Sequence, residues 1–86
     1  MLEHADLSYA NLIKANLERA GLHSADLRNA ELRKADLSSA ILSSANLANA
    51  YLSGANLFAA NLSNASLSDA YLGGTDLFDP LGSTNI

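Results

Sequence analysis

Residues 42–71 read LSSANLANAYLSGANLFAANLSNASLSDAY, and this stretch carries a leucine at every fifth position. The spacing continues in both directions, so leucine occupies sixteen consecutive fifth positions from Leu2 to Leu77. Alanine stands two residues before each leucine from Ala5 to Ala70, until Thr75 and Pro80 end the series. Such a strict period indicates a repeat architecture in which each repeat is one structural unit.

A period of five fits neither regular element. An α-helix turns about 100° per residue, so leucines five apart would scatter around the cylinder without forming an apolar stripe. A straight β-strand alternates faces with period two, so an odd step would send successive leucines to opposite sides. A chain that turns a corner every five residues avoids both problems, because each short extended piece can aim its leucine and alanine at a common axis.

The two residues after each leucine are expected to form the corner. A type II turn needs a positive φ at its second central residue, which suits glycine and asparagine. The second corner position holds Asn29, Asn49, Gly54, Asn64 and Gly74. The other corners lack such residues, so the sequence predicts a mixture of turn types.

Four roughly square corners would close one coil of twenty residues. The residues outside the leucine and alanine positions support this length, because several identities recur at a spacing of twenty. They include Tyr51/Tyr71, Phe58/Phe78, Lys14/Lys34 and Gly54/Gly74. The sequence therefore predicts about four coils stacked on one another.

The tandem phrase Ala-(Asp/Asn)-Leu-x-x, as in Ala45-Asn46-Leu47, resembles the pentapeptide-repeat family. The resemblance covers residues 1–80 and implies an all-β fold, a right-handed quadrilateral β-helix (a β-solenoid) with about four coils of twenty residues. All the leucines and alanines of the series are expected inside. Residues 81–86 are expected to form a short flexible C-terminal tail after this single domain.

Composition narrows the functional classes. The 86 residues carry nine acids and five bases, for a net charge of −4, and contain no cysteine. All five bases lie in residues 1–36, and no basic stripe for direct nucleic-acid binding is present. No apolar run reaches the eighteen residues that a membrane span needs. With no targeting signal visible, the expected localisation is cytoplasmic.

No catalytic, cofactor-binding or metal-binding constellation is visible, so we predict that the chain is not an enzyme. The Asp and Asn side chains before leucine are expected to support turns by hydrogen bonds to nearby backbone. Glu3 would lie one coil from His23, and with His4 this group is expected to be a solvated surface cluster. The Asp/Asn positions are Asp6, Asn11, Asn16, Asp26, Asp36, Asn46, Asn56, Asn61 and Asp76.

Four aromatic residues form the candidate partner-binding patch. In a twenty-residue coil, Tyr51 stacks on Tyr71 and Phe58 stacks on Phe78, with spacings of about 4.8 Å along the axis. These rings either brace neighbouring coils or form an exposed apolar surface that binds a protein. Ile41 is a further outward apolar residue on another side.

The leading functional hypothesis is a non-catalytic scaffold, used for protein–protein interaction or for structure, whose protein partner the residues do not identify. The resemblance implies an alternative, a DNA mimic that acts on a gyrase-type topoisomerase. Duplex DNA carries one charge per roughly 1.7 Å, so a rod of about 19 Å should mimic about eleven phosphates. The central coils, residues 37–68, are uncharged, which disfavours the alternative.

The C-terminal coil is the candidate dimer end. Its two glycines let a neighbour approach closely, and it carries less charge than the first coil, so an end-to-end homodimer is predicted. The resemblance adds an analogy with family members that dimerise through their C-termini. The residues of this end are Gly73, Gly74, Leu77, Phe78 and Pro80.

Overall fold

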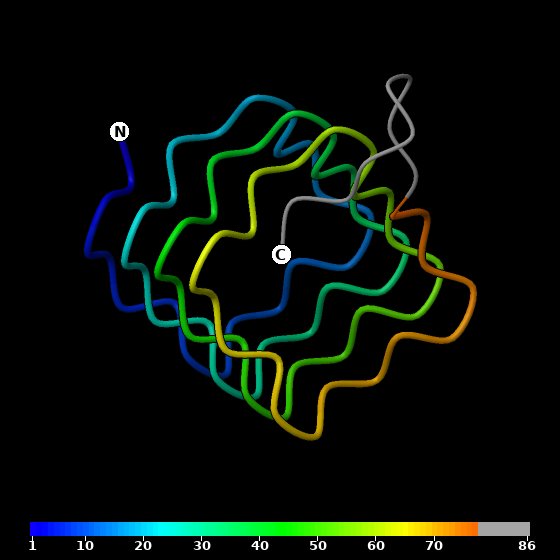
Figure 1. Ribbon diagram of the computed structural model, residues 1–86. Helices are drawn as coiled ribbons and strands as arrows, with labels where there is room; N and C mark the ends of the chain where they lie inside the picture. The colour runs from blue at the N-terminus through cyan, green and yellow to red at the C-terminus, as the bar shows by residue number, and fades with distance from the viewer. Residues whose placement is uncertain (78–86) are drawn as a thin grey trace.

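The computed structural model describes residues 1–77, and these wind into a stack of coils (Figure 1). Within this range the chain has no helix and no continuous strand. Its extended positions are single residues, each joined by a parallel bridge to a residue twenty positions away in a neighbouring coil. The bridges run from Asp6–Asp26 to Asn56–Asp76, so the predicted all-β class is present as bridged residues rather than long strands.

Backbone hydrogen bonds between coils repeat with the same register. Leu7 N donates to Asp26 O at 2.7 Å, and Asp26 N donates back to Ala5 O at 2.9 Å. The later repeats up to Leu57 make equivalent bonds, as in Leu27 N to Asn46 O at 2.7 Å. The backbone therefore has the twenty-residue register that the sequence predicts, and every inner coil is bonded on both sides.

The corners are uniform, and the prediction of mixed turn types is wrong. In each turn the alanine N–H donates to the leucine carbonyl three residues back, as in Ala45 N to Leu42 O at 3.0 Å. The second corner residue has a positive φ at every corner up to Gly74. This includes residues poorly suited to it, such as Tyr9 (62°), Lys14 (60°) and Ala59 (61°).

Stacking explains this uniformity. The second corner residue also donates its N–H to the first corner residue of the next coil, as Ser24 N does to Ser43 O at 2.9 Å. A corner of another shape would break that bond and leave polar backbone groups without a partner. The bonds between coils therefore override the local preference of each side chain for a negative φ.

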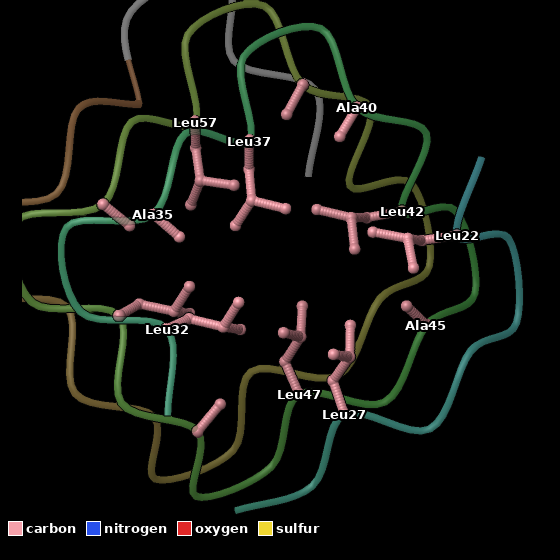
Figure 2. Packing of buried hydrophobic residues seen from close by; sticks show 14 of the residues in the cluster. Leu22, Leu27, Leu32, Ala35, Leu37, Ala40, Leu42, Ala45, Leu47 and Leu57 are labelled. Atoms are coloured by element: carbon pink, nitrogen blue, oxygen red, sulfur yellow. The ribbon is translucent and has the colours of Figure 1, made fainter. Parts of the chain in front are cut away.

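The core is a column of leucine side chains walled by alanine (Figure 2). Every leucine from Leu22 to Leu62 is at most 2% exposed, and the alanines between them are also buried. The expectation that the whole series lies inside needs a correction at both ends. Leu2 is 37% exposed, and Leu67, Leu72 and Leu77 are half-buried, because within residues 1–77 the first and last coils have a neighbouring coil on one side alone.

The Asp and Asn side chains act as predicted. The Oδ1 atom of each of eight residues accepts the backbone N–H two positions on, as Asn46 Oδ1 does from Ala48 N at 3.1 Å. Because these bonds hold the start of each corner, the side chains have a structural role. The eight are Asp6, Asn11, Asn16, Asp26, Asp36, Asn46, Asn56 and Asn61.

Candidate functional site

Tyr51 and Tyr71, here called the tyrosine pair, form the candidate site. Each precedes an interior leucine, so its side chain points outward while the leucine points to the axis. A parallel bridge joins the two residues, and Leu52 N donates to Tyr71 O at 2.8 Å. The backbone thus places the rings one directly above the other.

The predicted stacking of the tyrosine pair is observed. The ring centroids lie 4.8 Å apart and the ring planes differ by 3°. The side chains nevertheless stay open to solvent, with residue exposures of 39% for Tyr51 and 54% for Tyr71. Each ring therefore covers one face of the other, while a substantial part of both residues stays in contact with solvent.

Small residues follow each tyrosine of the pair at the corner. The residues two and three positions after each tyrosine are Ser53 and Gly54 in one coil, and Gly73 and Gly74 in the next. A Cβ built on Gly73 would meet no atom within 4 Å. The side of Tyr71 next to Gly73 is therefore open, whereas one coil earlier the Lys34 side chain lies beside Gly54, with its Cγ 3.4 Å from where a Cβ would stand.

The phenylalanines of the predicted patch add less to the described surface than the tyrosines do. Phe58 lies on the next side of the coil and is half-buried, and its N–H donates to Asn56 Oδ1 at 2.9 Å. Phe78 lies outside the described residues, so the predicted Phe58/Phe78 pair stays a prediction. The described part of the patch is therefore the tyrosine pair with Phe58 at its margin.

The predicted dimer end is described in part. Gly73 and Gly74 are exposed, and Leu77 is half-buried. Pro80, like Phe78, lies outside the described residues. Gly74 is the second residue of the last described corner, and its φ is +71°.

The histidines come together with a serine. His4 and His23 make an edge-to-face contact with centroids 5.9 Å apart, and His23 Nδ1 lies 2.7 Å from Ser43 Oγ. Glu3 instead binds the Met1 amino group at 2.7 Å, and this hydrogen bond holds the pKa of Glu3 below its usual value. The carboxylate thus binds the terminal amino group, and Glu3, His4 and His23 are all exposed, as expected for a surface cluster.

The remaining carboxylates are held by structural contacts. Arg28 donates two side-chain hydrogen bonds to Asp26, at 2.8 and 2.6 Å, and these lower the pKa of Asp26. Arg33 forms an ion pair with Glu31. The hydroxyl and N–H of Ser38 bond to Asp36 and lower its pKa in the same way. All of these groups are exposed or half-buried, so their ion pairs contribute little to stability.

Residues 1–77 contain neither a candidate metal site nor a candidate membrane-spanning helix. No group of three or more His, Asp or Glu side chains in that range could hold a metal ion. No helix in the same range is long and apolar enough to cross a membrane.

Tyr9 was not singled out by the sequence reasoning. It is 77% exposed and holds φ at 62°, which is unusual for a bulky aromatic residue. The position of Tyr9 in the repeat could have indicated its positive φ, because it is the second corner residue, where glycine or asparagine fits. It lies in the first coil, two coils from Tyr51 along the stack, and so is outside the candidate surface.

Comparison with known proteins gives a family and a fold. A family model of pentapeptide repeats, with eight copies, matches residues 2–38 and 40–77. The crystal structure of the pentapeptide repeat protein Rfr23 from the cyanobacterium Cyanothece 51142 is 38% identical, with a TM-score of 0.68 over 83% of this chain and 50% of that one. The pentapeptide repeat protein alr5209 from Nostoc Pcc 7120 is 37% identical, with a TM-score of 0.54 over 81% of this chain and 62% of that one.

The chain thus spans about half the length of the first of these structures and under two thirds of the second. The comparison with curated proteins gave no match.

Proposed function

Because the chain belongs to the pentapeptide-repeat family, we propose that it is a non-catalytic scaffold that binds a protein through the tyrosine pair. The scaffold is a right-handed, four-sided β-helix of about four coils. A turn every five residues and a register of twenty support that shape. An experimental structure that gave a left-handed winding or a three-sided coil would contradict it.

The interior supports a non-catalytic role. Leucine and alanine fill the core, and no polar or charged residue among those described is buried. Catalytic acids and bases are usually placed in partly desolvated pockets, which shift their pKa towards the working pH. Here the shifted carboxylates are exposed or half-buried, and hydrogen bonds to neighbouring corner residues or the N-terminus move their pKa away from neutral pH.

The observation that carries the proposal is the exposed stack of Tyr51 on Tyr71. A ring pair that served to brace two coils and nothing more would gain by being covered, since burial of the aromatic surface is favourable. These residues instead stay 39% and 54% exposed although their rings stack. Tyrosine combines apolar area with a polar tip, and it is enriched in protein–protein interfaces for that reason.

The charge arrangement gives no support to a DNA mimic. In one outward column the acids Asp36 and Asp76 are separated by Asn56, so they lie two coils, or about 9.6 Å, apart. Duplex DNA has one charge per about 1.7 Å of axis. The ion pairs of Asp26 and Glu31 with arginine also neutralise part of the acidic surface.

Affinity capture with matched variants tests the proposal. Three chains are immobilised and exposed to native cell lysate: the wild type, a Tyr51→Ser/Tyr71→Ser variant and a Tyr9→Ser control. The proteins that each chain retains are quantified by mass spectrometry. We expect at least one protein to be retained by the wild type and the control and to be lost by the double variant. Thermal melts establish that all three chains are folded. If the folded double variant retains the same proteins at the same level, the tyrosine pair is a brace and the proposal is wrong.

A further inference from the structure

The corner that follows Tyr51 has an unused backbone donor. At eight corners the N–H of the first corner residue is bonded by the Asp or Asn two positions back, as Ala48 N–H is by Asn46 Oδ1 at 3.1 Å. Tyr51 stands where that Asp or Asn would be, and its ring offers no acceptor so close to the backbone. Among residues 1–77 no atom accepts the N–H of Ser53, the first residue of this corner.

The Ser53 N–H points to the outer surface. The corner has the common shape, because Ala55 N donates to Leu52 O at 2.9 Å and Gly54 has a φ of +71°. The N–H therefore points to the place that a side-chain oxygen fills at the Asp and Asn corners, outside the coil and next to Tyr51. A backbone donor is costly to leave unpaired, so an oxygen atom of water or of a ligand must fill that place here.

The Lys34 side chain lies over the same corner. Its Cγ is 3.4 Å from where a Cβ of Gly54 would stand, and its own N–H donates to Ser53 O at 3.0 Å. Because Gly54 has no side chain, the aliphatic part of Lys34 reaches the coil of Tyr51. Lys34 is exposed, and none of the ion pairs among residues 1–77 includes it.

Neighbouring acids do not neutralise Lys34. Lys14 holds the equivalent position one coil earlier and adds a second base without an ion pair among the described residues. Glu31 is paired with Arg33, and Asp36 accepts two hydrogen bonds from the residue two positions on. This corner thus keeps a local positive charge on a chain whose net charge is −4.

We propose that this corner binds the carboxylate of an acidic side chain on the protein partner. The Ser53 N–H and the Lys34 ammonium hold the carboxylate oxygens, and the adjoining part of the partner contacts Tyr51. The inference rests on the proposed function, since it names the chemistry that the partner brings to the tyrosine pair. Carboxylates accept several hydrogen bonds, and bonds assisted by charge are stronger than neutral ones.

The corner at Ser43 shows what Lys34 adds. Ile41 stands two positions before Ser43, so the Ser43 N–H also lacks a partner among residues 1–77. No lysine or arginine occupies that column of corners, and no aromatic residue precedes it. An open N–H alone selects no ligand, whereas an open N–H beside a lysine and a tyrosine selects an anion with an apolar neighbour.

Two-dimensional NMR of the isotope-labelled chain tests the site with a defined probe. The probe is acetyl-Glu-Tyr-amide, and acetyl-Gln-Tyr-amide is its uncharged control. With the probe added up to about 10 mM, the Ser53 amide proton should move downfield, whereas that of Ala48, which Asn46 already binds, should stay in place. The control should bind several-fold more weakly. A Ser53 amide that does not move, or equal binding of the two dipeptides, overturns the proposal.

Inorganic phosphate distinguishes an acidic side chain from a free anion. Phosphate has no apolar part to contact Tyr51, so at equal concentration it should move the Ser53 amide less than the acidic dipeptide does. A larger response to phosphate would overturn the assignment to an acidic side chain of a protein.

Ser53→Pro removes the donor. Proline suits the first central position of a turn of this type and has no N–H, and the chain loses no hydrogen bond of its own there. The probe Kd, followed at the Gly54 amide, should rise about fivefold, whereas Ser53→Ala keeps the N–H and should stay within about twofold of wild type. A folded Ser53→Pro chain with the wild-type Kd overturns the proposal.

A second pair of variants closes the donor without proline. Tyr51→Asn and Tyr51→Leu both remove the ring, but the asparagine also brings an Oδ1 atom that can accept the Ser53 N–H, as Asn46 does for Ala48. The Ser53 amide should therefore respond to the probe in Tyr51→Leu and stay still in Tyr51→Asn. Equal responses in the two variants would contradict the role of this N–H.

Lys34→Gln tests the charge. It should raise the probe Kd about threefold at low salt and less at high salt, because an exposed ion pair is screened. Arg19→Gln is the matched control, since it removes the same charge from another exposed base that is in none of the ion pairs among residues 1–77. Equal effects of the two variants would reduce the role of Lys34 to net charge and would overturn the proposal.

The capture experiment separates this inference from the proposed function. We expect a protein that the Tyr51→Ser/Tyr71→Ser chain loses and that Lys34→Gln retains at a lower level than wild type. If Lys34→Gln retains it at the wild-type level, the tyrosine pair binds a partner and the carboxylate site is wrong. If the double serine variant loses nothing, the proposed function is wrong, and the dipeptide titration alone decides whether the corner holds a carboxylate.

Discussion

Two alanines in equivalent corners should respond in opposite directions to the same substitution. Ala59 is the second residue of its corner and holds φ at 61°, whereas Ala48 is the first residue of its corner and has no positive φ. Both are small and neither has a polar side chain, so replacement by glycine removes a single methyl group in each case. Ala59 is exposed and Ala48 is half-buried.

The magnitudes follow from the backbone. A left-handed conformation costs an L-residue roughly 1–2 kcal/mol, and glycine escapes this cost. Glycine also loses more backbone entropy on folding, which destabilises by roughly 0.5–1 kcal/mol relative to alanine. Ala59→Gly should therefore stabilise the fold by about 0.5–1 kcal/mol, whereas Ala48→Gly should destabilise it by about 0.5–1 kcal/mol.

Urea denaturation followed by far-UV circular dichroism measures both changes. The midpoint should rise for Ala59→Gly and fall for Ala48→Gly at similar slopes, and the thermal midpoints should move by several degrees in the same directions. The double variant should lie near wild type, since the sites are in different repeats. Equal losses of stability in the two single variants would show that the left-handed corner is not strained, and the explanation of uniform corners by stacking would lose its support.

Three further outcomes are expected. Leu42→Ala should lower the free energy of unfolding by about 2–5 kcal/mol because it opens a cavity in the closed core. Leu2→Ala should cost far less because Leu2 is 37% exposed, and the midpoints of urea denaturation compare the two variants. Gly54→Ala should destabilise the fold because φ is +71° there. Gly73→Ala should be neutral or stabilise the fold by up to about 1 kcal/mol, and a thermal melt in which Gly54→Ala is the more stable variant would contradict this order. The depressed pKa of Asp36 means that its contribution to stability is present above the ordinary carboxyl range and is lost as the pH falls through the folded-state pKa. Asp36→Asn should thus flatten the acid side of the stability profile, and an unchanged profile would assign acid sensitivity to other carboxylates.

The position of the candidate site was predictable from the sequence, but its surroundings were predictable only in part. The spacing of Tyr51 and Tyr71 placed the two rings in one column, because the register of twenty is written in the repeat itself. Their exposure, and the open side beside Gly73, depend on which side chains lie around the column in three dimensions. The contact of His23 with Ser43 likewise depends on rotamers that no spacing specifies.

The sequence by itself determined the period, the inward positions and the role of the Asp and Asn side chains, because all three depend on residues two to five apart. Alternation in extended chain sends alanine and leucine to one side, and the side-chain oxygen of a residue such as Asn46 reaches the N–H two positions on. These are local relations, so the pattern of residues is enough to predict them.

Only the tertiary structure decided the shape of the corners and the limits of the core. Ala59 and Tyr9 adopt a left-handed φ against their own preference, because a corner must match the coil stacked on it. Leu2 is exposed and Leu42 is buried although both occupy the same place in the repeat, because burial needs a coil on each side. Residues that repeat identically in sequence thus differ in environment, since the hydrogen bonds and packing that define it come from chain segments twenty residues away.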